Sequence, residues 1–219
     1  QDDNILLNYL NDDGQNVEPE YYIPIIPMIL VNGMLGIGTG FSTSIPKFNP
    51  KDIIKNIKNK LNKKPYLSMK PWYRGYTGDI IKISNYHFIS MGKYTINKNQ
   101  EIEINELPIN TWTDDYKLYL DKLLEKNEIL DYTNHSTDTE VKFIIKVDNN
   151  ILYDNKYLEN DNCDKIQKKL KLTSQLKLTN LHCYDKEGKI NKYNSIYDIL
   201  DEHYYERYNL YIQRKENQI

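Results

Sequence analysis

The sequence lacks the cysteine pairs, histidine motifs and long apolar runs that are typical of metalloenzymes, secreted proteins and membrane proteins. Its two cysteines, Cys163 and Cys183, form no C-x-x-C pair, which is typical of structural thiols in a reducing compartment. The four histidines are scattered, and neither an H-E-x-x-H metal motif nor a G-x-S-x-G nucleophile turn occurs. No apolar run reaches membrane-spanning length, and the first residues lack the basic segment of a targeting signal. We therefore assign no catalytic residue and no metal ligand, and we expect no membrane partner.

An excess of charge of one sign is also missing. The 219 residues carry 29 Lys and Arg against 31 Asp and Glu, so any surface that binds nucleic acid must be local. Lysines concentrate in one stretch that fits either a solvated helix face or a set of phosphate contacts. They are Lys47, Lys51, Lys55, Lys58, Lys60, Lys63, Lys64 and Lys70.

Glycine is scarce, yet four of the nine glycines fall within residues 33–40, which read G-M-L-G-I-G-T-G around Ile37. The apolar run from Pro24 to Val31 precedes this cluster and predicts a rigid, buried stem. A dinucleotide-binding G-x-G-x-x-G pattern would need glycine where Phe41 stands, so phosphate binding of that kind is excluded. Two interpretations are left. Either Ile37 packs in the core after a glycine turn, or glycines let the backbone approach DNA while Ile37 acts as a minor-groove wedge.

The pattern along the chain predicts an α+β protein. Asn49 and Pro50 are start signals for a helix with isoleucines at helical spacing, and the segment Ser195–Asp198 resembles the capping box of a long last helix. The other expected helices are 1–16, 113–125 and 161–170. The expected strands are 79–83, 86–91, 94–96, 101–105, 139–147, 176–184 and 188–193.

Several segments resemble, in order and spacing, the DNA-cleavage core of eukaryotic-type DNA topoisomerase II, a type IIA topoisomerase. These are residues 17–33, 36–43, 45–50, 71–78, 106–113 and 214–215. One departure is Met34-Leu35, where the family usually has a small residue followed by an acid. Gyrase A subunits have a related Gly-Ile loop, but the tryptophan-bearing segments favour the eukaryotic-type enzyme.

The resemblance implies three parts of the fold. Residues 1–25 would end a winged-helix domain, residues 26–194 would form a mixed α/β tower domain with antiparallel strands, and residues 195–219 would begin a coiled-coil arm. It also implies that the nucleophilic tyrosine, the acidic Mg²⁺-binding domain and the ATPase lie outside this stretch. Mg²⁺ and ATP would serve the full-length enzyme, a nuclear homodimer, and no cofactor is expected on these residues.

The resemblance further implies that this stretch grips and bends the double-stranded DNA that the full isomerase cuts, and that alone it is inactive. Ile37 would intercalate, and the expected DNA-binding residues are Asn32, Gly36, Gly38, Thr39, Ser42, Lys47 and Arg74. Trp72, Tyr73 and Trp112 could also line DNA or could belong to the core. The alternatives are a non-enzymatic architectural DNA-bending protein, a protein-interaction module and a gyrase A-type subunit.

Overall fold

The computed structural model describes residues 6–219 and divides the chain into two compact units. The first unit combines Gln1–Pro71 with Leu178–Ile219, and the second is Trp72–Lys177. The chain thus leaves the first unit and returns to it after the second. The boundaries expected at residues 25 and 194 do not coincide with this division, and they stay a prediction about functional domains.

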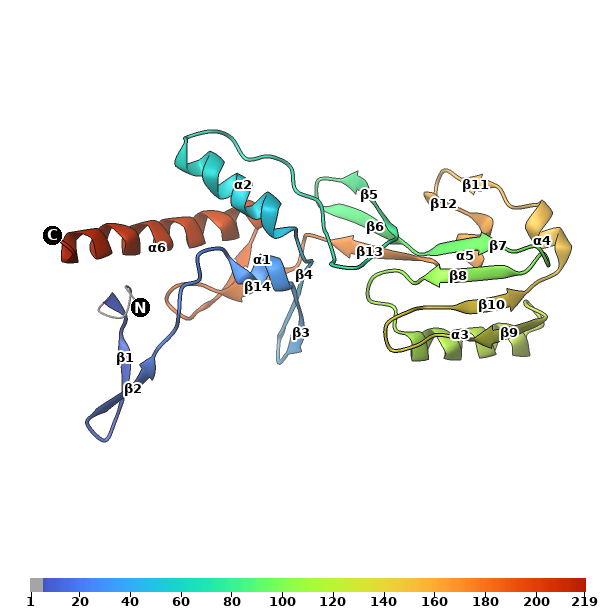
Figure 1. Ribbon diagram of the computed structural model, residues 1–219, viewed down its shortest axis with the longest axis horizontal. Coiled ribbons are helices and arrows are strands. Elements are labelled where there is room, and N and C mark those ends of the chain that lie inside the picture. The colour runs from blue at the N-terminus through green and yellow to red at the C-terminus, as the bar shows by residue number, and fades with distance from the viewer. Residues whose placement is uncertain (1–5) are drawn as a thin grey trace. The chain divides into compact units, whose positions relative to one another are not determined.

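Within residues 6–71 and 178–219, the first unit consists of β-hairpins and helices, most of which are labelled in Figure 1. The hairpins are β1 (Tyr9–Asp12) with β2 (Gln15–Pro19), β3 (Met34–Gly38) with β4 (Phe41–Ile45), and β14 (Leu181–Tyr184) with β15 (Ile190–Tyr193). The helices are α1 (Met28–Asn32), α2 (Pro50–Leu61) and α6 (Ile196–Asn217).

Local signals explain α2 and α6, and both predicted helices are confirmed. The side chain of Asn49 accepts a hydrogen bond from the Lys51 amide at 3.0 Å, and Pro50 begins α2. Ser195 and Asp198 form the predicted capping box of α6. Lys60 of α2 lies 2.7 Å from Asp201 of α6, so an ion pair joins the two helices.

The second unit is built on two antiparallel sheets. One has the order β13 (Thr173–Lys177), β6 (His87–Met91), β5 (Asp79–Ser84), and the other has the order β7 (Lys93–Ile96), β8 (Ile102–Glu106), β10 (Phe143–Lys146), β9 (Asp131–Asn134). Its remaining elements are α3 (Thr113–Glu125), α4 (Asn149–Tyr153), β11 (Tyr157–Leu158), β12 (Cys163–Asp164) and α5 (Lys165–Lys169). The sheets and helices confirm the predicted α+β class.

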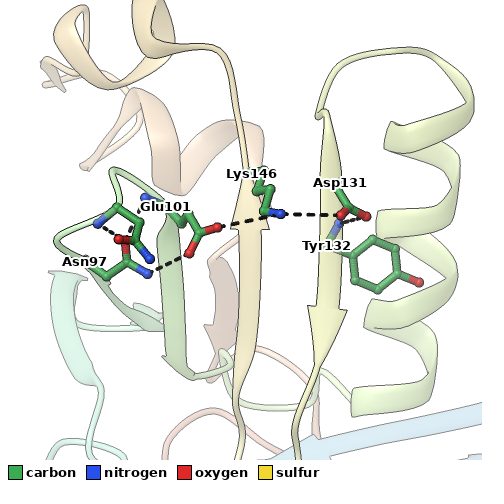
Figure 2. A network of polar contacts seen from close by, with 6 residues as sticks. Asn97, Glu101, Asp131, Tyr132 and Lys146 are labelled. Atoms are coloured by element: carbon green, nitrogen blue, oxygen red, sulfur yellow. Dashed lines mark hydrogen bonds and ion pairs between the residues drawn. The ribbon is translucent and has the colours of Figure 1, made fainter.

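The core of the second unit lies where α3 and α5 pack with β8 and β10. Phe143 is fully buried, and its ring meets the Tyr116 ring edge-on at 5.3 Å. At the exposed side, Lys146 lies between Glu101 at 3.9 Å and Asp131 at 3.8 Å, as Figure 2 shows. Because the side chains of Lys146 and Asp131 are largely solvated, we assign the network at most about 1 kcal/mol and no site role.

The helix expected over residues 1–16 is wrong where the structure describes it. Residues 9–19 form the β1–β2 hairpin, and residues 1–5 lie outside the described residues. The reason is the turn, in which Asp13 and Gly14 both have positive φ, 47° and 83°. Asp-Gly in that conformation is a hairpin signal, and it outweighs the apolar spacing around Leu10.

Other predicted elements differ mainly in their ends. The strand expected over 139–147 shortens to β10, and the helix over 161–170 shortens to α5. The strand expected over 176–184 is interrupted between Lys177 and Leu181, where the chain returns to the first unit. Among the described residues, no helix has the length and apolarity needed to cross a membrane.

Candidate nucleic-acid interface

The β3–β4 hairpin presents Ile37 near its tip. Ile37 pairs with Ser42 across the hairpin, and the chain turns at Thr39 and Gly40, where Gly40 has a φ of 82°. The Ile37 side chain is 92% exposed, so the core interpretation is wrong for this residue. The stem is also less buried than expected, since Ile25 is 71% exposed while Leu30 is fully buried.

The four glycines around Ile37 fall into two pairs. Gly33 and Gly40 have positive φ values of 66° and 82°, and a Cβ on Gly33 would lie 2.8 Å from the Ile45 carbonyl oxygen. These two are required by the fold itself. A Cβ on Gly36 or Gly38 would meet nothing closer than 3.9 Å or 3.8 Å, and neither has a positive φ. The fold therefore does not explain why the residues on either side of Ile37 have no side chain.

Polar residues of the predicted set surround the hairpin. Asn32, Thr39 and Ser42 are exposed, and Ser42 Oγ accepts a hydrogen bond from Asn180 Nδ2 at 2.9 Å. Lys47 is exposed, and its stem lies against Gly33, since a Cβ there would lie 2.9 Å from Lys47 Cγ. The structure thus gathers the predicted residues other than Arg74 on and beside one hairpin.

Arg74 belongs to the second unit, where it is exposed. In the same unit the two tryptophans are also accessible, because Trp112 is 73% and Trp72 is 37% exposed. A core position is therefore excluded for Trp112. A DNA contact by Arg74, Trp72 or Trp112 stays a prediction.

The lysine stretch follows the hairpin along α2. Lys51, Lys55 and Lys58 are exposed on this helix, whereas Ile53 and Asn56 are buried. Lys60 differs, because its hydrogen bond to Asp201 raises the pKa of the ammonium group and ties it to α6. The exposed lysines thus supply positive charge next to the hairpin in the sequence, while Lys60 has a structural partner.

Sequence reasoning missed two residues that contact the hairpin. Asn180 bonds to Ser42, and the ring of His182 lies 6.1 Å from that of Phe41 in an edge-on arrangement. Local spacing carries no signal for these contacts, because Asn180 follows Ser42 by 138 positions.

The described residues offer no built centre for covalent or metal chemistry. No group of three or more His, Cys, Asp or Glu within residues 6–219 is arranged to hold a metal ion. Burial raises the pKa of the Cys183 thiol to about 11, so near neutral pH it is protonated and a poor nucleophile. What the described residues do present is an exposed apolar side chain, Ile37, between two glycines of a hairpin.

Comparisons with known proteins agree over the whole chain. Residues 1–219 match the family of the DNA gyrase/topoisomerase IV A subunits. DNA topoisomerase 2 of Plasmodium falciparum is 43% identical over 216 residues, which cover 97% of this chain and 15% of that protein. DNA topoisomerase 2 of Penicillium chrysogenum is 38% identical over 221 residues, covering 99% of this chain and 14% of that protein.

A solved structure is similar in fold as well as in sequence. The crystal structure of the Plasmodium falciparum topoisomerase II DNA-binding, cleavage and re-ligation domain superposes with a TM-score of 0.89 at 42% identity. The match covers 100% of this chain and 29% of that one.

Proposed function

The chain belongs to the family of the DNA gyrase/topoisomerase IV A subunits, and from this we propose that it grips and bends the duplex that a type IIA topoisomerase cleaves. It spans only 14% and 15% of the two DNA topoisomerase 2 relatives named above. The proposal therefore concerns one step of the enzyme's cycle, the shaping of the DNA segment before cleavage.

The observation that carries the proposal is the exposed Ile37 between Gly36 and Gly38. An isoleucine that is 92% exposed at a hairpin tip gains nothing from burial in its own protein. Inserted between two base pairs, it would fill the space opened by unstacking. The two bare glycine positions would let the hairpin backbone come close to the minor-groove walls.

In this proposal Ile37 unstacks the base pairs, and the charged side chains supply the binding energy that offsets the cost of unstacking. Unstacking one base step costs a few kcal/mol, and additional protein contacts along the bent duplex must offset that cost. The exposed side chains of Lys47, Lys51, Lys55 and Lys58 are suited to contact phosphates, as is Arg74 of the second unit. Asn32, Thr39 and Ser42 would add hydrogen bonds to the sugar-phosphate backbone.

The resemblance supports further parts of the proposal for the whole enzyme. It would be a nuclear homodimer that uses Mg²⁺ and ATP, with residues 26–194 in its tower domain. The described residues show no metal-ligand group, so no step assigned to them goes through Mg²⁺. Their contribution is to bind and bend DNA, and the wedge supplies no covalent chemistry.

The test of this proposal is DNA bending. A duplex of about 30 bp with fluorophores at its two ends should show more energy transfer when the protein binds at low salt. Unchanged transfer at saturating protein would contradict the proposal. An architectural DNA-bending protein would behave in the same way in this assay. The two are separated by whether the parent reading frame holds an arginine-tyrosine pair upstream of these residues.

Binding is expected to be weak and steeply dependent on salt. The chain has a net charge of −2, so affinity must come from a few local lysine contacts that release counterions. Replacing Lys51, Lys55 and Lys58 with alanine should lower the slope of log affinity against log salt by about 1 for each lost phosphate contact. Anisotropy titrations at several salt concentrations measure this slope.

Lys146→Ala is the matched control for the lysine variants. Lys146 lies between two carboxylates in the second unit (Figure 2), and its loss should leave the slope unchanged. Binding that does not respond to salt would argue against phosphate contacts altogether.

The chain alone is expected to leave supercoiled DNA intact, even with Mg²⁺ and ATP. By resemblance, the nucleophilic tyrosine and the metal-binding acids of the enzyme are not among these residues, and the chain offers no substitute thiolate. Agarose-gel relaxation and nicking assays measure this. A covalent DNA adduct on the purified protein would sink the prediction.

A further inference from the structure

Asn180 contacts the β3–β4 hairpin through both its backbone and its side chain. Its carbonyl oxygen accepts a hydrogen bond from the Ser44 amide at 2.9 Å and lies 3.5 Å from Thr43 Oγ1. Its side-chain Nδ2 donates to Ser42 Oγ at 2.9 Å. One residue therefore holds three consecutive residues of β4.

The side chain of Asn180 is itself fixed from the other end. Asn180 Oδ1 lies 2.8 Å from His182 Nδ1, and because an amide oxygen only accepts, that ring nitrogen carries the proton. The His182 ring in turn meets the Phe41 ring edge-on. With its oxygen engaged by His182, the amide turns its Nδ2 toward Ser42 Oγ.

The hairpin needs such support. In the described structure β3 and β4 form a two-stranded sheet, and an isolated two-stranded hairpin is only marginally stable in water. A cavity of about 420 Å³ lies beside it, lined by Gly36, Phe41, Tyr184 and Ile190 among others. This space would allow the hairpin to tilt if β4 were not attached.

We infer that Asn180 is a positioning residue that holds β4 against the start of β14, so that Ile37 meets the duplex in a fixed orientation. This role rests on the proposed function of Ile37 as a wedge. Ile37 can keep two base pairs apart only if the β3–β4 hairpin that carries it is not displaced when the side chain enters the DNA. Asn180 supplies that resistance without touching the tip, and it stands three positions after Lys177, where the chain returns from the second unit.

The first test compares bending with affinity in the 219-residue protein. In Asn180→Ala, the increase in energy transfer that binding causes at saturating protein should be several-fold smaller. The affinity for the same duplex should fall far less. Asn180→Asp should restore transfer, because its carboxylate oxygens can accept from both the Ser42 hydroxyl and His182 Nδ1. Thr179→Ala, at an exposed neighbour, should behave as the unaltered protein does.

The second test needs no DNA and covers the case in which Asn180→Ala does not fold. In Ser42→Ala the same side-chain hydrogen bond is lost at an exposed position. Amide hydrogen exchange in residues 41–45 should become several-fold faster in the free protein. Exchange in β8 should not change, and it serves as the internal reference.

The outcomes separate this inference from the proposed function. The positioning role alone is overturned if Asn180→Ala bends the duplex as the unaltered protein does. It is also overturned if amide hydrogen exchange of residues 41–45 is unchanged in both Asn180→Ala and Ser42→Ala. A failure of the unaltered protein to bend the duplex contradicts the proposed function, and the positioning role with it. Loss of bending that Asn180→Asp does not restore also overturns the inference.

Discussion

Replacing Ile37 with alanine is expected to abolish most of the DNA bending and to leave the free energy of unfolding unchanged within about 0.5 kcal/mol. The side chain is 92% exposed, so its removal takes away almost no buried surface. In the complex, the same side chain would be the group that keeps two base pairs apart. Melting curves measure the first effect, and energy transfer across an end-labelled duplex measures the second.

Ile53→Ala is the matched control, because it makes the same chemical change at a fully buried position of the same unit. Deletion of a buried isoleucine side chain to alanine costs about 2–5 kcal/mol. Ile53→Ala should therefore melt at a clearly lower temperature, and below that temperature it should still bend DNA. An Ile37→Ala protein that is strongly destabilised but bends normally would overturn the assignment of Ile37.

Three helices, α2, α3 and α6, could be predicted closely from the sequence, whereas the helix expected over residues 1–16 was wrong. The bounds of α3 match the expected residues 113–125, and α2 and α6 begin at the caps that the sequence indicates. Caps and apolar spacing act within one or two turns, so they can be recognised without knowledge of the rest of the chain.

Long-range contacts could not be predicted in this way. The pairing of β4 with Asn180 joins residues more than 130 positions apart, and no local pattern encodes it. The exposure of the Ile37 side chain could not be predicted from the local sequence either. One isoleucine among glycines fits a core turn as well as a surface wedge, and only the surrounding structure separates them. The resemblance to a known family favoured the wedge, and the geometry removed the core alternative.

Substitutions at the glycines near Ile37 are expected to change protein stability and DNA bending in opposite ways. Gly38→Ala should leave stability unchanged or raise it by up to about 1 kcal/mol, because its backbone is compatible with a side chain and the unfolded chain loses freedom. Its Cβ would lie 3.8 Å from the Phe41 carbonyl oxygen, an ordinary contact. DNA bending should nevertheless fall, and fall further in Gly38→Val, because the added carbon atoms hold the hairpin away from the groove.

Gly33→Ala, in contrast to Gly38→Ala, should destabilise the free protein. Gly33 has a φ of 66° and a ψ of 176°, a backbone conformation that is essentially restricted to glycine and costs an alanine roughly 1–3 kcal/mol. The clash of its Cβ with the Ile45 carbonyl oxygen adds about 1–3 kcal/mol. Gly33 directly precedes β3 and Gly38 ends it, and each alanine variant removes one glycine from this segment, so composition cannot explain a difference between them. Melting curves and the bending assay on the two proteins decide the point. If Gly38→Ala and Gly38→Val bend DNA normally, the glycines beside Ile37 are not there for close approach to the duplex, and that part of the interface is wrong.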